Sequence, residues 1–129
     1  MNNPSKKISV LVVDDDPMVR RINNAFLNKY KLETQVAKNG KEAVEFCISG
    51  NCFDLILMDM EMPIMDGPQA TKELRAMGVN SRIVGLTSRN LESEKKAFIE
   101  AGLDDCLEKP LNNRIIEYLL QSLQMAEKP

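Results

Sequence analysis

Several residues whose side chains can perform chemistry stand directly after apolar segments of this sequence. In chain order they are Asp14, Asp15, Asp16, Asp59, Thr87, Ser88 and Lys109. Carboxylates that lie close together repel one another, so a cluster of them is costly unless a cation lies between them. Mg²⁺ is a hard cation that takes oxygen ligands and keeps several waters, which leaves room for phosphate oxygens. These residues therefore predict a divalent-cation site, provided that the fold brings them together.

The same side chains suit phosphoryl transfer. The carboxylate of Asp59 could attack phosphorus and form an acyl phosphate. Mg²⁺ would bridge this nucleophile and the incoming phosphoryl oxygens, while the Lys109 ammonium and the Thr87 hydroxyl would each bond another oxygen. Such transfer depends mainly on positioning and on charge stabilisation, which these groups would supply.

The elements that would position these residues alternate along the chain. Apolar and β-branched segments predict strands at 8–13, 33–37, 55–59, 83–86 and 105–108. Helical spacing predicts helices at 17–30, around 43–47, at 67–77, at 91–101 and around 115–123. Five strands alternating with five helices predict an α/β fold with a doubly wound, five-stranded parallel sheet. Ligands of such sheets bind beyond the carboxyl ends of the strands, where the polar residues listed above would meet.

Each of these residues also has a purely structural interpretation. Asp16 can cap the helix that follows it, and Asp59 could be a turn residue. Thr87 and Ser88 could cap the helix near 91, and Lys109 could be a solvated loop lysine. Their joint placement on one sheet edge favours the functional interpretation over these separate ones.

The chain resembles the receiver domain of two-component response regulators. The stretches that carry the resemblance are 10–15 (VLVVDD), 54–59 (DLILMD), 62–67 (MPIMDG), 83–88 (IVGLTS) and 108–110 (EKP). The resemblance implies the flavodoxin-like (βα)5 receiver fold in a single domain over residues 1–129, with a core at about 8–123 and short flexible ends. Three further stretches, at 59–63, 101–103 and 106–111, are most similar to plant type-C regulators, which are stand-alone receivers without a DNA-binding output domain.

The resemblance also implies a role for each site residue. Asp59 would accept the phosphoryl group, Thr87 would be the switch hydroxyl, and Lys109 would pair with the phosphate. The ligands of Mg²⁺ (or Mn²⁺) would be Asp14, Asp15, Asp59 and the backbone carbonyl of Glu61. The Lys109–Pro110 peptide bond would be cis.

The implied phosphodonor is a histidine-containing phosphotransfer protein, which suits a chain that has no histidine. The protein would take up the phosphoryl group and lose it by autohydrolysis, acting as a stand-alone regulator or as a phosphate sink. Whether it counts as an enzyme stays open, because it has no separate small-molecule substrate. We expect a monomer of plant cytokinin signalling in the cytoplasm, with the nucleus as a second compartment.

The composition excludes several other classes of function. Without histidine, the chain has no His-based triad and no His metal ligand. A net charge of -2, with no long basic run, gives no general attraction to DNA or to anionic membranes. Neither a signal peptide nor an apolar run of about 20 residues occurs, so a soluble intracellular protein is expected. Cys47, Cys52 and Cys106 are expected to be small buried or half-buried thiols in a reducing compartment.

Three positions beside the expected site depart from the family pattern or extend it. Many receivers have an aromatic residue three positions before the lysine, where this chain has Cys106, so the usual aromatic switch is in doubt. Glu61 lies two residues after Asp59, and Arg89 lies two residues after Thr87. We hypothesise that Glu61 and Arg89 approach each other and control the access of water to the phosphoryl group; the alternative is two independent solvated side chains.

Two apolar groups could either pack internally or bind a partner. Met18, Val19, Ile22 and Phe26 are expected mostly in the core, although one or two could stay exposed and contact a partner helix bundle. Met60, Met62, Ile64 and Met65 could form an adaptable apolar loop beside the site, or could pack as an ordinary loop.

Two other functions compete with the receiver hypothesis. A phosphatase of the haloacid dehalogenase type would use Asp14 as its nucleophile in a D-x-D motif, but it would leave Asp59 without a role. A pseudo-receiver would be a binding module with an inactive site, although every expected site residue is present. Phosphate trapped on Asp14 would favour the first, and failure to bind Mg²⁺ would favour the second.

Overall fold

Five strands and five helices alternate along the chain. The computed structural model describes residues 7–89 and 91–127. The elements are β1 (Ser9–Val13), α1 (Pro17–Lys29), β2 (Glu33–Ala37), α2 (Gly40–Ile48), β3 (Leu55–Asp59), α3 (Gly67–Ala76), β4 (Arg82–Thr87), α4 (Glu92–Glu100), β5 (Asp105–Glu108) and α5 (Asn113–Glu127). Their order agrees with the α/β alternation that the sequence predicts.

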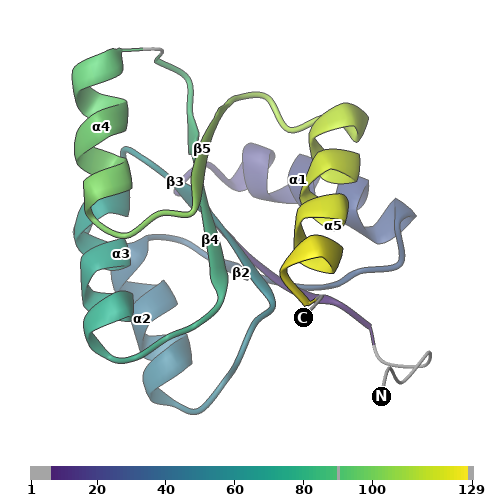
Figure 1. Cartoon of the computed structure of the whole chain (residues 1–129), viewed down its shortest axis with the longest axis horizontal. Coiled ribbons are helices and arrows are strands. Elements are labelled where there is room, and N and C mark those ends of the chain that lie inside the picture. Colours follow the sequence, from purple (N-terminus) through teal and green to yellow (C-terminus); the bar gives the residue numbers. More distant parts are fainter. Residues whose placement is uncertain (1–6, 90, 128–129) are drawn as a thin grey trace.

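The strands form one parallel sheet in the order β2-β1-β3-β4-β5. Helices α1 and α5 cover one face of this sheet, and α2, α3 and α4 cover the other (Figure 1). The doubly wound fold is therefore confirmed. β1 lies between β2 and β3, and Val13 is in register with Met58. The first residues after β1 therefore lie beside the end of β3.

The two faces of the sheet are packed separately. Successive side chains of a strand point to opposite faces. Leu11 and Val13 accordingly join the core against α2, α3 and α4, whereas Val10 and Val12 join the core against α1 and α5. Full burial of such a side chain contributes roughly 1.5–3 kcal/mol, so both faces of β1 hold it in place.

Side-chain caps fix the starts of α1 and α3. Asp16 accepts a hydrogen bond from the Met18 backbone N–H, with Pro17 in the first turn of α1, as the sequence predicts. Asp66 caps α3 in the same way by accepting from the Gln69 N–H. At the start of α3, a Cβ on Gly67 would lie 2.3 Å from the backbone oxygen of Asp59, so glycine is required for this close approach.

The packing of α1 differs from the expectation. Met18 and Ile22 were expected mostly in the core but are 63% and 47% exposed. Asn23 and Leu27 are the buried residues of this helix, because the helix is rotated so that this stripe faces the sheet. The alternative, in which one or two apolar residues of this helix stay exposed, is therefore the correct one.

Smaller differences occur elsewhere. The expectation of buried or half-buried thiols holds for Cys47 and Cys106 but is wrong for Cys52, which is exposed. Met77, expected on the buried face of its helix, is 43% exposed just after the end of α3. The expected loose end at 125–129 is wrong for 125–127, which are helical in α5. The other expected loose residues, 1–6 and 128–129, lie outside the described residues. Within the described part of the chain, no helix is long and apolar enough to cross a bilayer.

Candidate functional site

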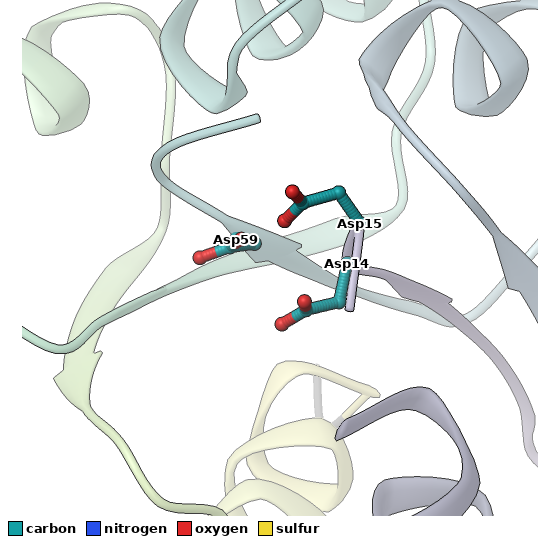
Figure 2. A group of neighbouring side chains, drawn as sticks. All are labelled: Asp14, Asp15 and Asp59. Carbon is teal, nitrogen blue, oxygen red and sulfur yellow. The ribbon is translucent and has the colours of Figure 1, made fainter. Parts of the chain in front are cut away.

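Three carboxylates meet at the carboxyl edge of the sheet. Asp59 is the last residue of β3, and Asp14 and Asp15 follow the neighbouring strand β1. Figure 2 shows the three side chains side by side, with Asp14 and Asp15 extending toward the side on which the Asp59 carboxylate lies. Carboxylate oxygens of all three lie within 4.8 Å of one another. Asp14 and Asp59 are buried, at 3% and 7% exposure, whereas Asp15 is exposed.

Lys109 neutralises part of this charge. Its Nζ lies 2.8 Å from Asp14 Oδ2 and 2.9 Å from Asp59 Oδ1. The Lys109 backbone N–H also donates to the Thr87 carbonyl at 2.8 Å, which fixes the loop after β5 against β4. The peptide bond between Lys109 and Pro110 is cis, as the family resemblance implies.

The environment shifts the pKa of two of these groups. Burial raises the pKa of Asp59 to about 6, and the hydrogen bond from Lys109 offsets only part of this effect. Burial alone would lower the pKa of Lys109, but its hydrogen bonds to Asp14 and Asp59 outweigh burial, so that its pKa is raised. Lys109 is therefore charged near neutral pH, and Asp59 changes its charge within the mildly acidic range.

The donor set fits a divalent cation. Lys109 supplies one positive charge against three carboxylates, so the cluster keeps an excess of negative charge. All the converging donors are carboxylate oxygens, which Mg²⁺ prefers, and the exposed Asp15 leaves one side open to water. Asp14 is held in place on its other side, because Oδ1 accepts from the Asp16 N–H at 3.0 Å.

Thr87 lies at the end of β4, and its hydroxyl is already engaged. The Oγ1 atom donates to the Arg89 carbonyl at 2.8 Å and accepts from the Arg89 N–H at 3.0 Å. The alternative role of Thr87 and Ser88 as a cap of the next helix is wrong, because α4 begins after Leu91 without a side-chain cap.

Glu61 and Arg89 form an ion pair at the rim of the site. Arg89 Nη1 lies 2.9 Å from Glu61 Oε1, with both side chains more than half exposed. The predicted approach of these two residues is therefore confirmed, while their effect on water access and the Glu61 backbone carbonyl as a ligand stay predictions. Cys106, at the position where many receivers have an aromatic residue, is buried in β5.

Two charged residues near the site fall outside the sequence motifs. The Arg20 guanidinium donates to the backbone carbonyl of Asp14 at 2.7 Å and so steadies the loop after β1. Glu94 in α4 lies 3.4 Å from Arg89 Nη2. Neither contact has a signal in the spacing of the sequence, because each depends on how a helix packs against a loop.

Similarity to known proteins identifies the class. Residues 10–121 match the family described as response regulator receiver domain. The chain is 53% identical over 110 residues to "Two-component response regulator 24" of Arabidopsis thaliana, covering 85% of this chain and 79% of that protein. It is 52% identical over 120 residues to "Two-component response regulator ARR22" of the same plant, covering 92% and 84%.

A solved complex contains a similar fold. The co-crystal structure of the Saccharomyces cerevisiae histidine phosphotransfer signalling protein Ypd1 and the receiver domain of its downstream response regulator Ssk1 matches with a TM-score of 0.78. That match is 32% identical and covers 92% of this chain and 87% of the other. The chain belongs to the receiver domain family of response regulators. Within this family its curated relatives include the plant type-C regulators, in agreement with the resemblance in its motifs.

The raised pKa of Asp59 predicts how stability depends on pH in the metal-free protein. A carboxyl group whose pKa rises on folding stabilises the fold below its unfolded pKa of 3.8 and loses that effect as pH passes about 6. Asp59→Asn, which carries no charge, should therefore be more stable than the unsubstituted protein at pH 8 by on the order of 2 kcal/mol. The advantage should shrink toward pH 4.

Urea unfolding with EDTA at pH 4, 6 and 8 measures this difference. A difference in the free energy of unfolding that stays constant over this range would contradict the raised pKa.

Proposed function

We propose that this protein is a phosphoacceptor response regulator of a His-to-Asp phosphorelay, with Asp59 as the phosphorylated residue. The observation that carries the proposal is the position of Asp59. Its carboxylate lies at the end of β3 with the Lys109 ammonium 2.9 Å away and two further carboxylates within reach of a shared cation. This is the arrangement that an in-line attack on phosphorus needs, namely a nucleophile with positive charge fixed around it.

In the proposed reaction, a carboxylate oxygen of Asp59 attacks the phosphorus of a phosphohistidine on a partner protein. A P–O bond forms as the P–N bond breaks, and the electron pair of that bond returns to the imidazole, which takes up a proton. At neutral pH Asp59 is largely ionised, because its pKa of about 6 lies below the pH. Lys109 stays charged and pairs with a phosphoryl oxygen, and the Thr87 hydroxyl donates to another.

Asp14, Asp15, Asp59 and the backbone carbonyl of Glu61 would hold Mg²⁺ or Mn²⁺. When bound, the cation would neutralise part of the negative charge of the phosphoryl group. The acyl phosphate then ends by hydrolysis, in which water supplies the oxygen, orthophosphate leaves and the Asp59 carboxylate is restored. Together, uptake and hydrolysis drain phosphoryl groups from the partner, so the protein acts as a stand-alone regulator or phosphate sink.

The phosphodonor that we propose is a histidine-containing phosphotransfer protein. A chain without histidine must receive its phosphoryl group from elsewhere, and the similar receiver of Ssk1 was crystallised with such a protein. The similarity to plant regulators favours a plant phosphorelay such as that of cytokinin signalling, in the cytoplasm and the nucleus. The protein would act as a monomer, without binding DNA or membranes.

Three exposed apolar side chains offer the donor a docking surface. Met18 and Ile22 on α1 are 63% and 47% exposed, and Ile64 in the loop after β3 is 76% exposed. The other apolar residues of this loop behave differently: Met60 and Met62 are buried, and the half-buried Met65 packs against the core, as in an ordinary loop. A donor that brings its histidine to Asp59 must approach the carboxyl edge of the sheet, where both α1 and this loop begin.

Phosphotransfer tests the proposal directly. The protein is mixed with a ³²P-labelled histidine phosphotransfer protein and Mg²⁺, and the label on each protein is followed. We expect the donor to lose its label. Asp59→Asn should stop this loss because it removes the nucleophile, and EDTA should stop it because it removes the cation. A mutant that still drains label would refute the central role of Asp59.

Label on Asp14 would instead favour the phosphatase hypothesis. Failure of the unsubstituted protein to bind Mg²⁺ or to accept label would favour the pseudo-receiver.

The docking surface makes a second prediction. Ile22→Asp should slow transfer from the protein donor by about tenfold at limiting donor, since loss of one apolar contact residue costs on the order of 1–2 kcal/mol. Phosphorylation by a small phosphoramidate should not change, because it needs no docking. Ile48→Asp is a matched control: Ile48 is 68% exposed but lies at the far end of α2. Equal slowing by both substitutions would argue against docking at α1.

The ion pair at the rim makes a third prediction. If Glu61 and Arg89 limit the access of water, then Glu61→Ala and Arg89→Ala should each shorten the half-life of the aspartyl phosphate by about two- to fivefold. This range corresponds to the effect of up to about 1 kcal/mol that exposed ion pairs exert. The half-life is measured by loss of label after the donor is removed. Unchanged half-lives in both variants would exclude the gating role.

A further inference from the structure

We propose that Glu94 is a positioning residue that competes with Glu61 for the Arg89 guanidinium and thereby shortens the lifetime of the phosphoryl group on Asp59. The inference rests on the proposed function. It adds a residue of α4 to the control of the site, although Glu94 does not touch the reacting groups.

Arg89 is shared between two elements. Its Nη1 lies 2.9 Å from Glu61 Oε1 in the loop after β3, and its Nη2 lies 3.4 Å from Glu94 Oε1 in α4. The Arg89 side chain is 53% exposed, so each pair is worth no more than about 1 kcal/mol. The contact with Glu61 is the shorter one, but both are weak, so loss of either carboxylate changes where the guanidinium spends its time.

The contact with Glu94 is incomplete. Its second carboxylate oxygen, Oε2, is buried and has no hydrogen-bond partner among the described residues. A buried acceptor without a partner is costly. Its carboxylate therefore gains when the guanidinium swings further toward α4, and such a movement takes Arg89 away from Glu61.

The backbone of Arg89 is linked to the phosphoryl site through Thr87. The Thr87 hydroxyl has one proton, and that proton is used in the bond to the Arg89 carbonyl at 2.8 Å. To donate to a phosphoryl oxygen, Thr87 must give up this bond, which loosens the residue whose side chain the two glutamates share. The buried Cys106 is not aromatic, so this route from Thr87 to α4 does not need the aromatic switch of other receivers.

The direction of the effect follows from this geometry. Glu94→Gln removes the charge that draws Arg89 toward α4, so Arg89 pairs more fully with Glu61 over the site. Water then reaches the acyl phosphate less often, and its half-life should increase by about two- to fivefold. Glu92 offers a matched control, because it lies in the same first turn of α4 and is exposed. Glu92→Gln makes the same change in charge near the helix N-terminus and should leave the half-life unchanged.

The experiment compares half-lives of the aspartyl phosphate, formed with a small phosphoramidate, in Glu94→Gln, Glu92→Gln, Arg89→Ala and the Arg89→Ala/Glu94→Gln double variant. If Glu94 acts through Arg89, its substitution should have no effect once Arg89 is alanine. Equal effects in both backgrounds, no effect in either, or the same lengthening by Glu92→Gln would overturn the proposal. A Glu94→Asp variant should restore part of the short half-life, because the charge returns.

A second measurement does not need phosphate. In the unphosphorylated protein, NMR of the Arg89 side chain reports how freely its guanidinium rotates. Glu94→Gln should change the rate of this rotation, because one of the two carboxylates that contact the guanidinium loses its charge, whereas Glu92→Gln should not. An unchanged rate in Glu94→Gln would overturn the sharing. If neither the unsubstituted protein nor its variants take up label on Asp59, the proposed function fails. The NMR measurement still decides in that case whether Glu94 and Glu61 share Arg89.

Discussion

One ammonium holds the two buried carboxylates of the site together. The Lys109 Nζ contacts Asp14 at 2.8 Å and Asp59 at 2.9 Å. Asp14 and Asp59 are almost completely buried, and buried charges of like sign are costly without a partner. Since Lys109 comes from the far end of the chain, this contact requires that β1, β3 and β5 all end at the same edge of the sheet. The parallel topology, with a crossover helix between successive strands, meets that requirement.

The site has to satisfy two conditions that oppose each other. Burial keeps bulk water away from Asp59, but it also raises the pKa of Asp59 to about 6 and so disfavours the ionised carboxylate. Lys109 relieves part of this conflict by supplying a positive charge, and the exposed Asp15 leaves one side of the site open to a cation. An acidic cluster that is incompletely neutralised by the protein suits the binding of a divalent cation.

The rim of the site follows a different physical rule from its centre. Glu61, Arg89 and Glu94 contact one another through partly exposed side chains, where interactions are weak and easily exchanged. Weak contacts suit the adjustment of a rate better than the support of a fold. The buried centre is therefore fixed by the fold, whereas contacts at the rim can change without disturbing it.

The sequence alone was sufficient to predict the fold and most of the residues that meet at the site. Continuous apolar strands that end in polar residues predicted the α/β fold, the sheet edge and the convergence of Asp14, Asp15, Asp59 and Lys109, because in parallel sheets the order of elements largely decides which ends meet. Local caps such as Asp16 were also predictable, since they involve residues close in the chain.

Tertiary structure alone decided the rotation of α1 that exposes Met18 and Ile22, the engagement of the Thr87 hydroxyl by Arg89, and the sharing of Arg89 with Glu94. These features depend on how a helix packs against a sheet or a loop, and small rotations there change the side-chain contacts without changing the pattern of the sequence.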